Sequence, residues 1–127
     1  LLGEDGPWGE YHAVSRVTYT DPEVGSVGMT EAQAREEGIE VAVGTADVGS
    51  SSRGWIHEAS GVVKVVADAS SGVVVGATTV APYGGEVLGL LSTAVHARLT
   101  VPVLTRMHLA YPTFHRVIGS ALRDTGL

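Results

Sequence analysis

The sequence contains no cysteine among its 127 residues. This absence excludes disulfide bonds, thiolate metal ligands and an internal redox dithiol from the chain. A chain without disulfides is compatible with the cytosol, so we expect a cytoplasmic protein.

Positive charge is scarce as well. Lysine occurs once, at Lys64, and the eight basic residues face 14 acidic ones, for a net charge of −6. The arginines are scattered and form no basic stripe along the sequence. This balance argues against nucleic acids and anionic membranes as partners.

Long apolar runs are missing, since none approaches the ~18 residues that a membrane-spanning helix needs. The N-terminus has no pattern of a secretory signal. We therefore expect no membrane partner. The chain begins with Leu1 instead of methionine, which favours a fragment or a processed piece of a longer protein.

What is present predicts one folded domain, because 44% of the residues are hydrophobic and 17% are charged. The opening stretch LLGEDGPWGE is rich in glycine and lacks periodicity, so residues 1–13 are predicted to be a linker or a frayed N-terminus. Within it, Leu1, Leu2 and Trp8 could dock elsewhere. Residues 14–127 are predicted to be the domain.

Alternating apolar and polar residues predict β-strands in five places. The stretches are AVSRVTYT, VGSVGM, IEVAVGTADV, VVKVVAD and VVVGATTVA. The last two flank the turn ASSG and predict a hairpin, and their continuous valines favour a central position covered on both faces. Residues 49–61, GSSSRGWIHEASG, have the composition of a loop.

Helical patterns occur mostly in the second half of the sequence. In TEAQAREEG, Thr30 and Gln33 form a capping-box pattern and Gly38 a stop, which predicts a short surface helix at a sheet edge. Residues 84–99 predict a longer helix, in which Gly89 suggests a close approach by another segment.

Two more helices are predicted after possible caps at Thr100 and Thr113. The last would bury one apolar face, made of Val117, Ile118, Ala121 and Leu122. Strands followed by helices predict an α+β fold, an antiparallel β-sheet with helices packed on one side.

The residues alone give no complete active site. The five histidines lack the His-x-x-x-His spacing, so we expect no metal site. No G-x-S-x-G elbow is present, which argues against a serine hydrolase. The glycines of VAPYGGE are compatible with an anion at a helix start, but a turn into a closely packed helix is the better interpretation.

Four blocks of the sequence, in order, resemble the C-terminal dimerisation domain of the FAD-dependent pyridine nucleotide-disulfide oxidoreductases, the family of dihydrolipoamide dehydrogenase, glutathione reductase and mercuric reductase. The blocks are VTYTDPEVGSVGMTEAQAREEG, GVVKVVADASSGVVVGATTVAP, GGEVLGLLSTAVHARLTVPVL and YPTFHRVIGSAL. The resemblance covers residues 14–122. It implies a homodimer through this domain, with FAD and NAD(P) bound by domains N-terminal to Leu1, so that this chain alone is not an enzyme.

The last block departs from the family pattern H-P-T-x-x-E, in which the histidine moves protons and the glutamate orients it. Here Tyr111, Pro112 and Thr113 are followed by Arg116 at the glutamate position. Tyrosine keeps its proton at pH 7, and arginine has no acceptor for an imidazole. The resemblance therefore implies no catalytic residue in this chain, and an approach of Tyr111, Pro112 and Thr113 to a partner's flavin.

These observations favour the dimerisation domain of a flavin- and NAD(P)-dependent oxidoreductase whose usual disulfide reduction is altered or lost. A homodimer would use the helix at 84–99 and the segment at 111–114 as its interface. One alternative is a stand-alone, non-catalytic homodimerisation module. Another is a small enzyme that uses His108 or His115 in a cleft of its own.

Overall fold

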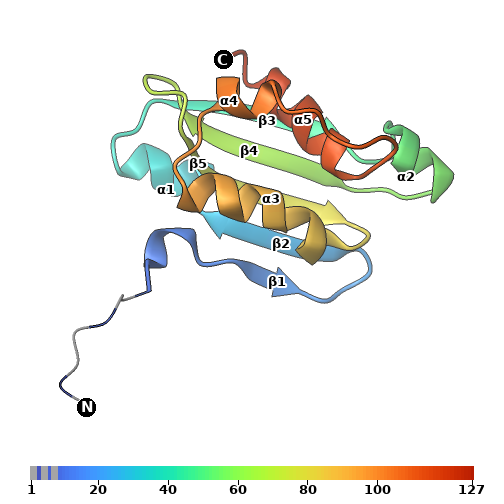
Figure 1. The fold of residues 1–127 in the computed structure, drawn as a ribbon, viewed down its shortest axis with the longest axis horizontal. Helices are drawn as coiled ribbons and strands as arrows, with labels where there is room; N and C mark the ends of the chain where they lie inside the picture. The colour runs from blue at the N-terminus through green and yellow to red at the C-terminus, as the bar shows by residue number, and fades with distance from the viewer. Residues whose placement is uncertain (1–2, 4–5, 7–8) are drawn as a thin grey trace.

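A computed structural model describes residues 3, 6 and 9–127 of the chain. Its centre is a five-stranded antiparallel sheet in the order β1-β2-β5-β4-β3 (Figure 1). The strands are β1 Arg16–Thr18, β2 Glu23–Gly28, β3 Val41–Asp47, β4 Val62–Asp68 and β5 Val74–Ala81.

Three helices cover one face of this sheet (Figure 1). Helix α3 packs on β2 and β5, α5 packs on β3 and β4, and α4 contacts α5. Their bounds are α3 Gly84–His96, α4 Val101–Thr105 and α5 His115–Asp124. The predicted α+β class, an antiparallel sheet with helices packed on one side, is confirmed.

The core lies between this helical layer and the sheet. Fully buried Leu88 and Leu91 of α3 and Ile118 of α5 belong to one cluster with inward-facing valines of the strands, such as Val63 and Val65. Burying each such side chain contributes roughly 1.5–3 kcal/mol to folding. The apolar face predicted for α5 is therefore the one that packs, since Val117, Ile118, Ala121 and Leu122 are all buried.

The other face of the sheet is only partly covered. Helix α1 Glu31–Glu36 lies there near the edge strand β3, with Ala34 fully buried. Val62 of β4 stays 39% exposed. The prediction that the valine-rich hairpin is central is confirmed. Cover on both faces holds for part of β4 in the described residues, because the consecutive Val65 and Val66 are buried whereas Val62 is not.

Two local predictions need correction. The stretch at 49–61 is not only a loop, because it contains the short helix α2 Ser52–Ile56, capped where the Ser51 hydroxyl accepts from the Gly54 amide at 2.9 Å. Thr113 does not cap α5, whose N-cap is Phe114. The Thr113 hydroxyl instead donates to the Ala110 carbonyl at 2.7 Å.

The N-terminal segment holds a single 3₁₀ turn, η1 Tyr11–Ala13, which lies against α3 (Figure 1). Leu1, Leu2 and Trp8 lie outside the described residues, so their docking, like the domain boundary after residue 13, stays a prediction. Within the part of the chain that the structure describes, no helix combines the length and apolar character needed to cross a bilayer.

Candidate functional site

The first of the four blocks, through Glu23, fixes the start of α3. A carboxylate oxygen of Glu23 accepts a hydrogen bond from the Gly85 amide at 2.9 Å. A negative charge at this helix end compensates free amides and the helix dipole. The Glu23 carboxylate thus occupies the helix start that follows VAPY, where an external anion would otherwise bind. This favours the interpretation of VAPYGGE as a packed turn.

Gly28, in the same block, is required by its backbone. Its φ is +67°, in the left-handed region that favours glycine. A side-chain carbon here would collide with the backbone carbonyl of Val75. The close crossing of β2 and β5 therefore excludes any larger residue.

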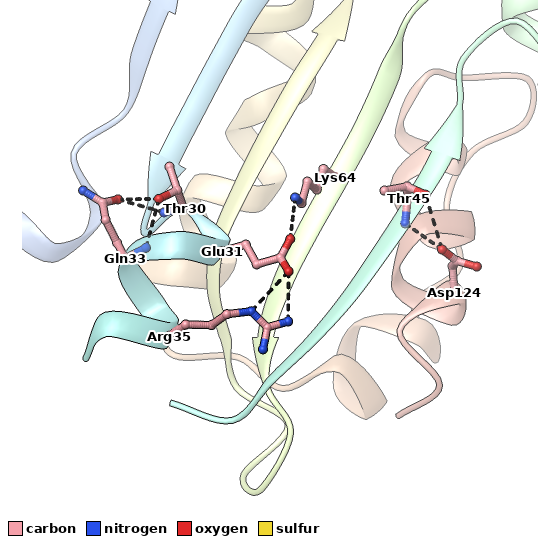
Figure 2. A network of polar contacts seen from close by, with 7 residues as sticks. All are labelled: Thr30, Glu31, Gln33, Arg35, Thr45, Lys64 and Asp124. Atoms are coloured by element: carbon pink, nitrogen blue, oxygen red, sulfur yellow. Dashed lines mark hydrogen bonds and ion pairs between the residues drawn. The ribbon is translucent and has the colours of Figure 1, made fainter. Parts of the chain in front are cut away.

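Glu31 joins two blocks that are far apart in the sequence. Its carboxylate accepts from the Lys64 ammonium at 2.8 Å and from the Arg35 guanidinium at 2.9 Å (Figure 2). The hydrogen bond from Lys64, followed by that from Arg35, lowers the pKa of the Glu31 carboxyl below its usual value.

The predicted capping box completes this corner. The backbone amide of Gln33 donates to the Thr30 hydroxyl at 3.2 Å, and the backbone amide of Thr30 donates to the side-chain oxygen of Gln33 at 2.9 Å (Figure 2). This prediction is confirmed. Together with the Glu31 pairs, the box fixes α1 against β4, so this corner has a structural role.

The segment at 111–113 lies beside α2 at one end of the sheet (Figure 1). The Tyr111 hydroxyl donates to the Ser52 hydroxyl at 2.9 Å, although the tyrosine side chain is 69% exposed. The Arg116 guanidinium lies 5.3 Å from the centre of the Tyr111 ring and donates to the Leu109 carbonyl at 3.3 Å. Tyr111 and Arg116, which sequence reasoning singled out, are therefore in contact.

A polar cavity of about 210 Å³ opens between α2, this segment and α5. Arginines, serines and the 111–113 segment line it, and no acidic side chain of the described residues does. Its lining is Ser50, Ser51, Ser52, Arg53, Tyr111, Pro112, Thr113, Arg116, Ser120 and Arg123. This cavity is the strongest candidate for a functional site in the chain.

Sequence reasoning did not anticipate the contribution of α2 to this site. Ser52 and Arg53 lie 58 to 59 residues before Tyr111 and sit in a stretch with loop composition. Only the sheet topology brings them to the same end as α5. The arginine at 53 carried no signal of its own, because the basic residues look scattered along the sequence.

The two histidines proposed for a small enzyme line neither this cavity nor the neighbouring grooves. His108 is exposed and His115 half-buried. Neither makes a hydrogen bond or ion pair from its side chain among the described residues. No general acid–base pair is formed around them, so the structure adds no support to that alternative.

A different group of histidines meets elsewhere. Donor atoms of Glu10, His12 and His96 lie within 4.8 Å of one another, and the two imidazoles stack with centroids 5.7 Å apart. Sequence spacing misses this group because 84 positions separate the two histidines. All three side chains are at least partly exposed, and the Glu10 carboxylate lies 3.4 Å from the His12 ring as an ordinary surface pair would.

Comparison with known families matches residues 14–122 to the profile described as "Pyridine nucleotide-disulphide oxidoreductase, dimerisation domain". Among curated proteins, the chain is 37% identical over 113 residues to dihydrolipoyl dehydrogenase of Haloferax volcanii and 34% identical over 117 residues to the mitochondrial enzyme of Pisum sativum. These alignments cover 88% and 91% of this chain, but 24% and 23% of the relatives.

Solved structures agree with the sequence matches. LpdA from Mycobacterium tuberculosis superimposes with a TM-score of 0.87 at 28% identity, over 96% of this chain and 27% of that one. The HOCl-induced flavoprotein disulfide reductase RclA from Escherichia coli gives a TM-score of 0.77 at 26% identity, over 90% and 26%. The chain spans about a quarter of the length of the relatives that it matches.

Proposed function

Since this chain belongs to the dimerisation domains of the pyridine nucleotide-disulphide oxidoreductases, we propose that it forms the two-fold contact of a flavin- and NAD(P)-dependent oxidoreductase. In that protein, domains outside this chain would bind FAD and NAD(P). The observation that carries the proposal is the family match over residues 14–122, together with the fold that it shares with LpdA.

The outer face of α3 supports a dimer contact. Gly89, Thr93 and Ala97 are exposed and spaced by four residues, so they share one side of the helix. A side-chain carbon added at Gly89 would meet no atom of the chain within 4 Å. Small residues let a second backbone approach closely, and a glycine in a helix costs about 1 kcal/mol relative to alanine.

A second group of exposed apolar side chains lies near the 111–113 segment. Tyr111 and Trp55 are 69% and 78% exposed, and Ile56 is 52% exposed. Contiguous exposed apolar residues are typical of interaction surfaces. We propose that α3 and residues 111–114 form most of the homodimer interface.

A flavin would have to be held mainly by other parts of the protein. The cavity beside Tyr111 is small, polar and open, whereas an isoalloxazine ring needs an enclosed, largely apolar site. We propose that Tyr111, Pro112 and Thr113 line one side of the flavin site of the partner subunit. When bound, the flavin supplies redox chemistry, and this chain supplies only that wall.

The acid–base pair of the family is proposed to be absent. At the two positions, Tyr111 donates to Ser52 and Arg116 lies over the tyrosine ring. Neither group accepts a proton as an imidazole and a carboxylate would. The oxidoreductase would therefore pass electrons to an acceptor other than a substrate disulfide, such as a quinone, a small electrophile or oxygen, and we place it in the cytoplasm.

The coding sequence upstream of Leu1 tests this proposal. We expect nucleotide-binding glycine loops there, and a purified full-length protein with flavin absorbance and a dimeric mass. An upstream sequence without such loops contradicts the oxidoreductase and favours the alternative, a stand-alone homodimerisation module. An upstream pair of cysteines in C-x-x-x-x-C spacing would contradict the loss of disulfide chemistry only if the protein also reduces disulfides.

A further inference from the structure

We propose that Glu10, His12 and His96 form a binding site for a divalent transition-metal ion, with Zn²⁺ as the ion that suits these ligands. All three ligands come from one chain, so the site depends neither on the proposed dimer nor on a flavin. A bound ion would fasten the segment before residue 14 to the C-terminal end of α3.

The three residues meet where η1 Tyr11–Ala13 lies against the C-terminal end of α3 (Figure 1). The hydroxyls of Ser15 and Ser92 form a hydrogen bond at 2.6 Å along the same contact. His96 follows Ser92 by four residues, so both project from the side of α3 that faces the N-terminal segment. Thr93, in the stripe assigned to the second copy, lies about 60° around the helix from His96. The site therefore borders that stripe and does not belong to it.

The first argument is the hydrogen-bonding state of His12. Its Nε2 lies 3.3 Å from the backbone carbonyl oxygen of His96. A carbonyl only accepts, so Nε2 carries the hydrogen and Nδ1 of the neutral ring carries a lone pair. This Nδ1 lies 3.4 Å from a carboxylate oxygen of Glu10. Two acceptors thus face each other, and they repel unless a proton or a metal ion is shared between them.

The second argument is the spacing of the donor atoms. Zn²⁺ lies about 2.0–2.2 Å from imidazole nitrogens and carboxylate oxygens, so neighbouring ligands of a tetrahedral ion are about 3.4 Å apart. The pair of Glu10 and His12 has this separation. A donor atom of each histidine and of Glu10 lies within 4.8 Å of the other two, and the His96 side chain is exposed and can rotate inward. Three protein ligands leave a fourth position for water.

The third argument is the surroundings of the ligands. Metal-binding histidines commonly donate their second ring N–H to a carbonyl, which fixes the ring and its tautomer, and the His12 bond to the His96 carbonyl does this. The two imidazoles stack with an interplanar angle of 11°, an arrangement that two imidazolium cations would oppose by charge repulsion. The C-terminal end of a helix such as α3 also favours a nearby cation.

Local histidine spacing predicts no metal site in this chain, because that rule recognises ligands on a single helical face. Here 84 positions separate His12 from His96. Only the packing of η1 on α3 brings them together, so the proposal depends on the tertiary structure and not on a sequence motif.

The test is a calorimetric titration of the 127-residue chain with zinc chloride at pH 7.5, above the ordinary imidazole pKa of about 6.5. We expect saturable binding of one Zn²⁺ per chain, and NMR shifts of the His12 and His96 imidazoles. Magnesium chloride at the same ionic strength should give no saturable binding, because Mg²⁺ prefers oxygen ligands. Hydrogen exchange of residues 10–13 should slow with Zn²⁺ and not with Mg²⁺.

Single variants identify the ligands. Glu10→Gln, His12→Gln and His96→Gln should each weaken Zn²⁺ binding by about tenfold or more. The matched control is His108→Gln, which removes an exposed histidine outside the group and should leave binding unchanged. Circular dichroism of each variant checks that the fold is retained.

Three results would overturn the inference. Zn²⁺ binding no stronger than Mg²⁺ binding would leave Glu10 and protonated His12 as an ordinary ion pair. Equal weakening by His108→Gln would reduce the effect to scattered surface histidines. One Zn²⁺ per two chains, with a doubled mass only when the metal is present, would contradict a site built by one chain. Sedimentation without metal tests the proposed dimer separately.

Discussion

Replacing Gly89 by alanine should stabilise the fold of the single chain. The position lies in the middle of α3 Gly84–His96 and is exposed, and an added Cβ would meet open space. Alanine should therefore gain close to the full helix-propensity difference of about 1 kcal/mol. That gain corresponds to a rise in melting temperature of roughly 3–6 °C for a domain of this size.

A larger side chain at the same position should act on the dimer instead. Gly89→Gln leaves the helix intact, but its side chain projects into the face that we assign to the second copy. We expect the dimer dissociation constant to rise by at least about tenfold, or about 1.4 kcal/mol. Sedimentation velocity over a concentration series measures this change, and thermal unfolding in dilute solution measures the effect on folding.

The matched control is Ala32→Gln, which adds the same atoms at an exposed position of α1 on the other face of the sheet. It should leave dimerisation unchanged. If Gly89→Gln dimerises like the unchanged chain, α3 does not form the interface. If Gly89→Ala lowers the melting temperature, the added methyl group does not point into open space.

Three further predictions concern the fold and its ionisable groups. Gly28→Ala should lower the free energy of unfolding by about 2 kcal/mol or more in chemical unfolding, because φ at this position is positive and the added Cβ would collide with the backbone carbonyl of Val75. A decrease below about 0.5 kcal/mol would refute this. Lys64→Met should move the pKa of Glu31 back up towards its usual value in an NMR titration, since Lys64 is the main cause of the lowering; an unchanged midpoint would contradict that cause. Hydrogen bonds from the hydroxyls of Ser71 and then Ser70 lower the pKa of Asp68 from 3.8 to about 2. The contribution of this carboxylate to stability is therefore complete above pH 3.8 and is lost as the pH falls through about 2. Ser71→Ala should shift that loss to higher pH in an acid unfolding titration, and an unshifted transition would count against this cause.

Much of the fold was predictable because its local signals agree with one another. The capping box of Thr30 and Gln33, the ASSG hairpin and the apolar faces of α3 and α5 each depend on residues close in sequence. Such patterns indicate strands and helices without any knowledge of long-range contacts. Their order, strands and then helices, was enough to predict the sheet and its helical layer.

What the sequence did not reveal depends on contacts between distant segments. Helix α2 is only five residues long, and its Ser51 cap was hidden in a run of serines. The cavity needs Arg53 from this helix beside Arg116 and Arg123 of α5, which only the sheet topology brings together. No period or local motif encodes that juxtaposition.

Tyr111 and Arg116 could be singled out from the sequence, but their contacts could not. That Tyr111 donates to Ser52 and lies under the Arg116 guanidinium follows from the meeting of α2 and α5. Tyr111 and Arg116 contact each other, and both line a cavity that also contains Arg53 and Arg123.

The central proposal is that this chain itself forms a dimer. Its mass in solution tests that proposal most directly. Sedimentation equilibrium from about 5 to 500 µM covers the range in which mass action should reveal even weak association. We predict a concentration-dependent rise from 13.1 kDa to twice that mass. A mass that stays at 13.1 kDa over the whole range would contradict the account.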